Sequence, residues 1–206
     1  MQVATSGAVG RIVAASLAEL RVECFELEGA PPLGALVAVA EQNPAVYGVV
    51  SSVTTEGVDP SRPVSPHGTA DEDLGTVLSR NPHLPVLLRT TFTAVVVGFE
   101  EGGALRHYLP DTPARLIARI RVCDANDQCR FAESLEFLEP LLQSGSLADD
   151  VVAAFIRRTS RAHADPYRFL LDAGRALVPL LMNEPDRLAA IVRRIRPNEE
   201  RGRMIQ

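Results

Sequence analysis

The chain has 206 residues, of which 46% are hydrophobic and 23% charged, and its net charge at pH 7 is −5. This balance is ordinary for a globular protein with a sizeable core. All 21 basic residues are arginine, which excludes a P-loop lysine, a kinase-type phosphate-binding lysine and Schiff-base chemistry. No apolar run approaches the roughly 20 residues of a membrane span, and the first residues lack a signal pattern. With three cysteines, too few for a disulfide framework, we expect a cytoplasmic protein that makes no membrane contact.

Short β-prone segments fill the first part of the chain. We predict strands over 9–14, 21–27, 35–40 and 46–53, separated by turn residues such as the Gly-Ala-Pro-Pro run at 29–32. In the second segment, polar Arg21 and Glu23 alternate with Val22 and Cys24, which is the pattern of a strand with one buried face. We therefore interpret Cys24 as a small core residue and not as a nucleophile.

A long polar segment follows over residues 55–83, which are rich in proline, glycine, serine, threonine and acidic residues. Loops of this length inside a compact domain are typically functional, disordered or bound to a partner. Within it, we predict that Asp71 caps a short helix that reaches Leu78 and ends before Asn81.

The strongest β signal lies beyond this loop. We predict a strand over 86–99, a tight turn at Glu101-Gly102-Gly103 and a return strand over 105–109. The run ARLIARIRV at 114–122 then alternates strictly, which predicts a further strand. Its two faces would carry Leu116, Ala118, Ile120 and Val122 on one side and Arg115, Arg119 and Arg121 on the other. The arginine face is expected to be solvated or to receive an acidic partner.

The hydrophobic period becomes helical after residue 128. We predict a helix over 131–142, in which Pro140 causes a kink or a break near the end. Ser146 and Asp149 have the spacing of a capping box and would open a second helix. A third helix would begin at Asp165-Pro166, and a fourth would run from 185 to 196, where Pro197 stops it.

These elements predict an α+β protein. Residues 1–127 would form a small closed antiparallel β-barrel with the long loop 55–83, and residues 128–206 would form a C-terminal helical bundle. Short strands separated by glycine and proline turns favour a closed barrel over an open sheet, because closure removes exposed edges.

No constellation of catalytic or metal-ligating residues is evident in the sequence. Five residues separate Cys123 from Cys129, more than the two to four typical of a zinc-binding pair, and no second ligand pair exists. No serine stands in a G-x-S-x-G context, and the two glycines at 102–103 lack the helix that a phosphate loop opens. We therefore predict no catalytic, cofactor-binding or metal-binding residues and no cofactor.

Four polar residues remain as functional candidates: His107, Tyr108, His83 and Arg89. The pair His107-Tyr108 is the most suggestive, because both side chains can carry protons. A strand would place the two on opposite faces, which favours a structural interpretation as a cross-strand pair. The remaining histidines, His67 and His163, lie in the long loop and at a helix end.

The first half of the chain also resembles a known family. The segments VGRIVAAS at 9–16 and PPLGALVAVAEQNPAVYGVVSSV at 31–53 are similar to the HAS barrel. This is the small N-terminal barrel of HerA-type DNA translocases and of the α and β subunits of rotary ATP synthases. The later segments NPHLPVLLRTTFTAVVVGF and ARIRVC resemble the remaining barrel strands, though less specifically.

What the resemblance implies is assembly or docking and not turnover. In the family, the barrel precedes a P-loop ATPase domain and helps to assemble its ring or to contact partners. This sequence contains no G-x-x-x-x-G-K-[ST] motif, and no family catalytic residue lies in the matched segments.

Three functional hypotheses follow. The first is a non-enzymatic interaction or assembly protein, accessory to an ATPase or a DNA-processing complex, that binds a protein partner or itself. The second is a small-molecule enzyme that uses His107 or His83, which a deep pocket would support. The third is a nucleic-acid-binding accessory protein, which the net negative charge disfavours. The arginines 193, 194, 196, 201 and 203 lack interleaved aromatic residues for stacking on bases.

Overall fold

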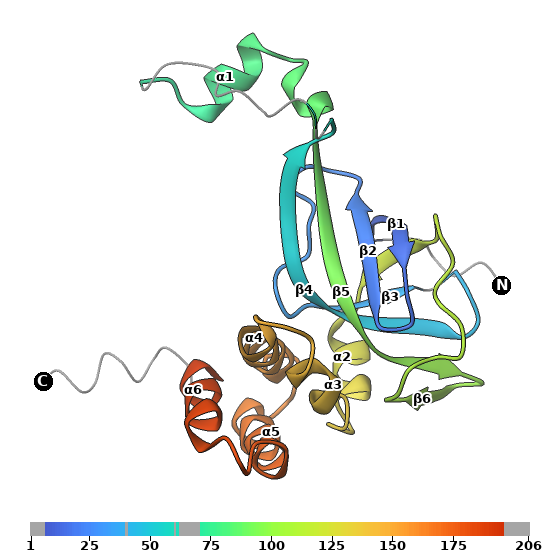
Figure 1. Ribbon diagram of the computed structural model, residues 1–206, viewed down its shortest axis with the longest axis vertical. Helices are drawn as coiled ribbons and strands as arrows, with labels where there is room; N and C mark the ends of the chain where they lie inside the picture. The colour runs from blue at the N-terminus through green and yellow to red at the C-terminus, as the bar shows by residue number, and fades with distance from the viewer. Residues whose placement is uncertain (1–6, 40, 60, 62–70, 196–206) are drawn as a thin grey trace, which may run out of the picture.

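The computed structural model describes residues 7–39, 41–59, 61 and 71–195 and shows a closed barrel with helices against its outer wall (Figure 1). Six strands form the ring in the order β2-β1-β7-β3-β4-β5, and a β2–β5 pairing closes it. Every pairing is antiparallel. The predicted α+β class and closed antiparallel barrel are thereby confirmed. The ring strands are β1 Ala8–Ala15, β2 Glu19–Cys24, β3 Leu36–Val39, β4 Ala45–Gly57, β5 Leu88–Glu101 and β7 Arg119–Val122.

A first hydrophobic core fills the barrel. Inward-facing residues alternate along the strands, as the period of two in a pleated strand requires. The core consists of Ile12, Leu20, Val22, Ala35, Val37, Val39, Val46, Val50, Phe92, Ala94, Val96, Phe99, Ala114 and Ile120. Cys24 packs half-buried against this core, as its interpretation as a core residue anticipates.

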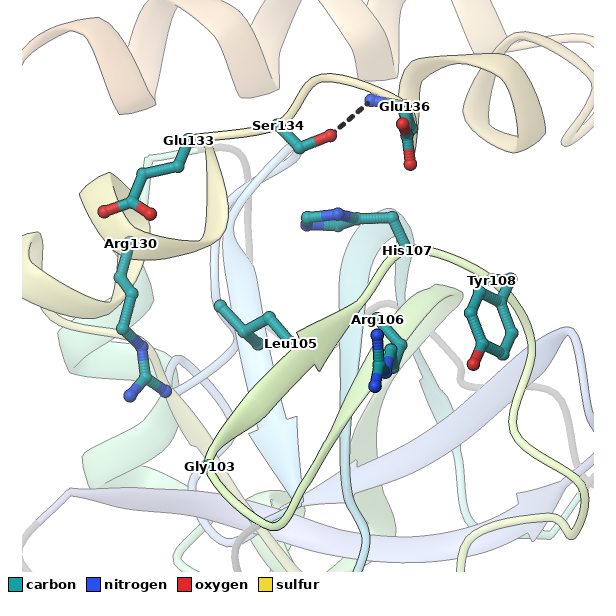
Figure 2. Close-up of a pocket in the computed structure, with 9 residues that line it drawn as sticks. All are labelled: Gly103, Leu105, Arg106, His107, Tyr108, Arg130, Glu133, Ser134 and Glu136. Atoms are coloured by element: carbon teal, nitrogen blue, oxygen red, sulfur yellow. Dashed lines mark hydrogen bonds between the residues drawn. The ribbon is translucent and has the colours of Figure 1, made fainter.

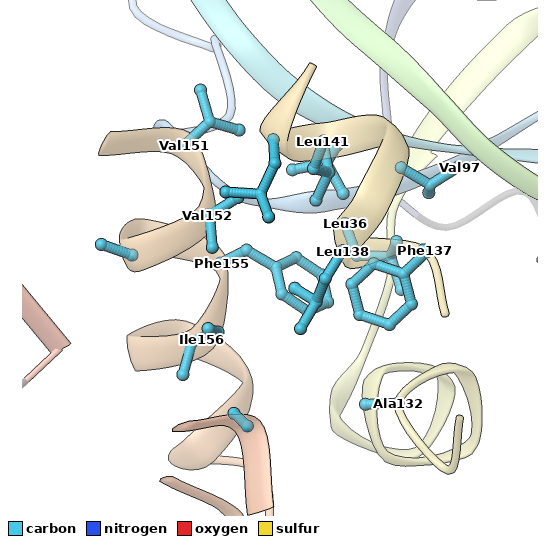
Figure 3. Close-up of a cluster of buried hydrophobic side chains, with 14 of the residues drawn as sticks. Leu36, Val97, Ala132, Phe137, Leu138, Leu141, Val151, Val152, Phe155 and Ile156 are labelled. Carbon is cyan, nitrogen blue, oxygen red and sulfur yellow. The ribbon is translucent and has the colours of Figure 1, made fainter. Parts of the chain in front are cut away.

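A second core joins the outside of the barrel to the helices (Figure 3). The outward side chains of Leu36, Tyr47, Val49 and Val97 contact apolar residues from the helical region. All four residues of β3 are buried because one face lines the barrel and the other lies beneath this layer. The helices are α2 Ala125–Phe131, α3 Leu138–Leu142, α4 Ala148–Ser160, α5 Pro166–Leu180 and α6 Pro185–Ile195.

Helix α4 lies close against the barrel at Gly34, which has a φ of 75°. A Cβ atom at Gly34 would lie 2.4 Å from the backbone nitrogen of Phe155 and 2.7 Å from the carbonyl carbon of Ala154. Only glycine combines this left-handed conformation with such a close backbone approach. Gly34 therefore marks the point where the helical layer rests on the barrel.

Several predicted strand boundaries were wrong. Residues 114–118 do not extend the last strand, because the chain turns there with Ile117 at a φ of 69°, and β7 begins only at Arg119. Leu116, which the prediction placed on the apolar face, is exposed, and so is Ile117. The 3-10 helix η1, Leu84–Leu87, occupies the start of the predicted 86–99 strand. The return strand β6, Ala104–Arg106, ends before His107 and pairs with β5 outside the ring.

Helix ends also differ from the predictions. The segment 131–142 is not one helix but the end of α2, an irregular connection and the short α3. Ser146 makes no cap, since α4 begins after Leu147 without a side-chain hydrogen bond. Asp73, and not Asp71, caps α1, which spans Leu74–Arg80. The predicted cap at Asp165 is confirmed, with its side chain accepting a hydrogen bond from the Arg168 amide at 2.9 Å.

The strands β4 and β5 continue beyond the barrel as a projecting two-stranded ribbon (Figure 1). Strand β2 pairs with β5 only from Thr91 to Val95, and β3 pairs with β4 only from Val46 to Val49. Beyond those limits β4 and β5 pair with each other as far as Gly57 and Leu88. We call residues 51–59 and 71–90, with η1 and α1, the arm. Part of the expected loop 55–83 is thus strand and helix, and its residues 60 and 62–70 lie outside the described residues.

Candidate functional site

The structure offers two surfaces for function, a cavity and the arm. The cavity has a volume of about 680 Å³ and lies where the β5–β6 hairpin meets α2 and the segment that follows α2 (Figure 2). Most of its lining side chains are polar or charged. The lining residues are Gly103, Leu105, Arg106, His107, Tyr108, Arg130, Glu133, Ser134 and Glu136.

His107 is anchored to α2 at the wall of this cavity. Its Nε2 atom lies 3.0 Å from the carbonyl oxygen of Phe131, and because a carbonyl only accepts, Nε2 carries the proton in this hydrogen bond. The imidazole packs edge-on against the Phe131 ring at 4.7 Å between centroids and at a tilt against Phe137 at 5.8 Å. These contacts give His107 a clear structural role.

Tyr108 lies beside His107 on the same cavity and not across a strand from it (Figure 2). Because β6 ends at Arg106, the alternation of a strand no longer applies to the two residues. The Tyr108 ring makes an edge-on contact with Phe99 at 5.4 Å. The structure therefore brings these two candidates together, whereas the other two, His83 and Arg89, lie on the arm.

His83 and Arg89 have different surroundings on the arm. His83 is exposed at the start of η1, where its side chain makes no capping hydrogen bond. Arg89 binds Glu56 across the two strands of the arm, with an Nη2–Oε1 distance of 2.8 Å. Arg89 therefore has a structural role, as one half of an ion pair that joins the two strands of the ribbon.

A polar cluster at one wall of the cavity, formed by buried Tyr47 with the partly exposed Glu100 and Arg130, was not anticipated from the sequence. The Tyr47 hydroxyl donates to Glu100 Oε2 at 2.9 Å, and Arg130 binds both Glu100 and, at 3.2 Å, the Tyr47 oxygen. Burial and the bond to Glu100 raise the pKa of Tyr47. The cluster ties α2 to strands β4 and β5, and so supports one wall of the cavity. Its three members are far apart in sequence, and no local pattern links them.

The cysteines do not gather into a site. In the described part of the chain, no group of three or more histidine, cysteine, aspartate or glutamate side chains is placed to hold a metal ion. Burial raises the pKa of the Cys123 thiol, and the Cys129 sulfur lies 3.2 Å from the Ala162 carbonyl oxygen. His163 is likewise engaged, with Nδ1 2.9 Å from the Thr159 carbonyl oxygen, while His67 lies outside the described residues.

The arginine face predicted for 114–122 meets acidic groups of the chain itself. Arg121 binds Asp127 at 2.6 Å and thereby fixes the start of α2. Arg119 forms an ion pair with Glu41 at the tip of the β3–β4 hairpin. In the C-terminal region, Arg194 binds Asp150 at 3.0 Å. Residues 196, 201 and 203 of the predicted arginine cluster lie outside the described residues.

The arm carries the second candidate surface. At its tip, the Val58 amide donates to the Leu87 carbonyl oxygen at 2.9 Å and brings the start of the loop against η1. Val86 is 78% exposed and Leu87 55% exposed, and Val53 and Val58 are also exposed. Scattered exposed apolar residues are normal, but a group on one projecting element is typical of an interaction surface.

Known proteins provide no direct guide to either surface. The chain matches no model of a known protein family, and a search of curated proteins finds no match. None of the helices in the described ranges is long and apolar enough to span a bilayer.

Proposed function

We propose that the protein is a non-enzymatic interaction or assembly protein that binds a protein partner through the arm. The observation that carries this proposal is the projecting β4–β5 ribbon with exposed Val86 and Leu87 at its tip. A strand pair that projects from the core exposes backbone groups and apolar side chains to water. Binding of a partner would bury this surface and so offset the free energy that its exposure costs.

The free edges of the ribbon offer a specific mode of binding. Beyond Val50, β4 pairs only with β5, so its outer edge from Ser51 to Gly57 has no neighbouring strand in the described chain. An unpaired edge can accept an added strand from another chain through main-chain hydrogen bonds. Apolar contacts to Val53 and Val58 would then add specificity to this backbone pairing.

The rest of the barrel supports the same assignment. The helical layer covers the outer face of β3, β4 and β5 near the barrel, whereas the arm and α1 lie at the opposite end of the molecule from α5 (Figure 1). A partner on the arm would therefore not compete with the helices for the same surface.

The resemblance to the HAS barrel supports a more specific proposal. The segments that carry the resemblance contribute β1, β3, β4, β5 and β7 of a closed six-stranded barrel. In that family the barrel serves assembly next to an ATPase. We therefore favour a partner that belongs to an ATPase or DNA-processing complex.

Comparative affinity capture tests the proposal. The experiment compares wild type with Val86→Asp, which places a charge on the arm tip, and with Leu116→Asp, which places one on an exposed barrel loop. We expect a protein that wild type and L116D retain and that V86D loses. The same set of captured proteins for all three would contradict binding through the arm.

One observation favours a second candidate, an enzyme that uses His107. The cavity volume of about 680 Å³ falls within the range of about 300–1,000 Å³ that small-molecule sites occupy, although the cavity opens to solvent and its lining is mostly polar. A thermal-shift screen with small metabolites tests this second candidate, with Arg106→Ala at the cavity and Arg21→Ala on the exposed face of β2 as the matched control. A compound that stabilises wild type and R21A but not R106A would support it, and turnover of that compound would establish an enzyme. A screen without such a compound would end it.

A further inference from the structure

Helix α5 has two apolar faces, and the described residues of the chain cover only one of them. Phe169, Ala173 and Leu177 are buried against the neighbouring helices. On the other side, Tyr167 is 70% exposed and Val178 is 52% exposed. Leu171 and, just beyond the helix, Met182 are also exposed. We call the residues Tyr167, Leu171, Val178 and Met182 the α5 stripe.

The spacing of the α5 stripe reads the same in both directions. Tyr167 precedes Leu171 by four positions, and Val178 precedes Met182 by four. Val178 follows Leu171 by seven positions, which is about two helical turns, so these two residues lie on one side of α5. A second α5 that runs antiparallel would place its Val178 against Leu171, and its C-terminal end, which Met182 follows, near the end that carries Tyr167.

The centre of the stripe allows two helices to approach closely. Gly174 stands three positions after Leu171 and four before Val178, next to the centre of the stripe, and a Cβ atom added there would meet no atom within 4 Å. The absence of a side chain at this position leaves room for the backbone of a partner helix, as small residues do at close helix crossings. Among the described residues, no neighbour lies close enough to this position to explain the glycine.

The charged residues beside the α5 stripe can also form ion pairs between two copies. Asp172 binds Arg168 at 3.3 Å and Arg175 at 3.1 Å along one flank. In an antiparallel pair related by a twofold axis, the same flank of both helices lies on one side of the interface. Asp172 of one copy then lies near Arg175 of the other, and the reciprocal pair forms at the same time.

We propose that the protein forms a homodimer in which the α5 stripes of two copies pack antiparallel about Gly174. This inference is independent of the arm, which lies at the opposite end of the molecule (Figure 1). A helix of 15 residues spans only about 22 Å. One face of such a helix buries less surface than the roughly 800 Å² per partner of a stable interface. The dimer is therefore a reversible one that dissociates on dilution.

Sedimentation velocity over a concentration series tests the association. Wild type should shift from monomer to dimer as concentration rises. Val178→Arg should remain monomeric, because it buries a cation in the stripe, and Val86→Arg on the arm should behave as wild type. A wild type that stays monomeric throughout would overturn the proposal in favour of a different occupant, such as the chain's own C-terminal segment or another protein. Dimers that persist in V178R would overturn it as well.

Cysteine cross-linking tests the antiparallel arrangement separately. Leu171→Cys and Val178→Cys are oxidised alone and as a mixture, with wild type as the control for the three native cysteines. Antiparallel packing predicts a disulfide-linked dimer in the mixture that is several-fold more abundant than in either variant alone. Cross-links that form equally well within L171C alone would indicate a parallel pair and would contradict the proposed geometry.

Discussion

Substitution of Gly34 by alanine tests the docking of the helical layer on the barrel. Two separate effects oppose a side chain at this position. The φ of 75° is a left-handed conformation, which costs an L-residue about 1–2 kcal/mol. The added Cβ would also lie 2.4 Å from the Phe155 backbone nitrogen, and relief of such overpacking costs about 1–3 kcal/mol.

The sum of the two effects predicts a loss of about 2–5 kcal/mol in the free energy of unfolding for Gly34→Ala. For a chain of this length, 1 kcal/mol lowers the Tm by about 2–4 °C, so the expected decrease is roughly 4–20 °C. Gly103→Ala is the matched control, because Gly103 has a φ of 84° but a Cβ there would meet no atom within 4 Å. This control should lose only the strain of about 1–2 kcal/mol.

Urea unfolding and thermal melts of the three proteins measure the difference. Both substitutions reduce the entropy of the unfolded chain to the same extent, so this effect cancels in the comparison. A stability of G34A below that of G103A reports the contact between α4 and the barrel. Equal stabilities would refute the close approach of α4 to Gly34 and with it the described position of the helical layer.

Three further predictions concern individual residues. Asp165→Ala removes the cap of α5 and should lower the Tm by roughly 2–4 °C, since a lost cap costs about 1 kcal/mol. Ser146→Ala should leave the Tm unchanged, because Ser146 caps no helix. A larger loss of Tm in S146A than in D165A would contradict this assignment of the caps. Hydrogen bonds from Arg119 lower the pKa of Glu41 in the folded protein. The ionised Glu41 carboxylate therefore adds to the free energy of unfolding at pH values above its ordinary pKa of 4.5, and this contribution is lost as the pH falls through the lower pKa of the folded state. Glu41→Gln should therefore flatten the acid side of the stability profile, measured by urea midpoints, and an unchanged slope would argue against the ion pair. Cys123 is buried with a raised pKa, so it should react with a thiol reagent only at the rate of unfolding; fast labelling of the native protein would exclude its burial.

The sequence predicted the barrel because its strands carry the period of two expected for half-buried surfaces. The same rule failed at 114–118, since alternation cannot reveal the left-handed backbone of Ile117 that turns the chain before β7. The alternation rule also predicted that the fourth strand ends at residue 53, whereas β4 continues to Gly57. Residues 54–56 are polar and exposed to solvent, and a polar strand in solvent has the composition of a loop.

Local sequence patterns do not specify the order of strands in the barrel or the distant residues that meet at a site. Strand β7 enters the ring between β1 and β3, and no local pattern specifies that pairing. The cluster of Tyr47, Glu100 and Arg130 depends on three segments that meet only in the folded chain. Conversely, the predicted cap at Asp165 was correct, because a cap depends on residues that are close in sequence.

Site-specific photo-cross-linking in cells tests the proposed role most directly. A photoreactive amino acid is placed at Val86 on the arm tip or at Leu116 on the barrel loop, both of which are exposed. Binding through the arm predicts a covalent adduct with one distinct protein from position 86 and not from position 116. The absence of any adduct from position 86, or the same adducts from both positions, would contradict the arm as the binding element.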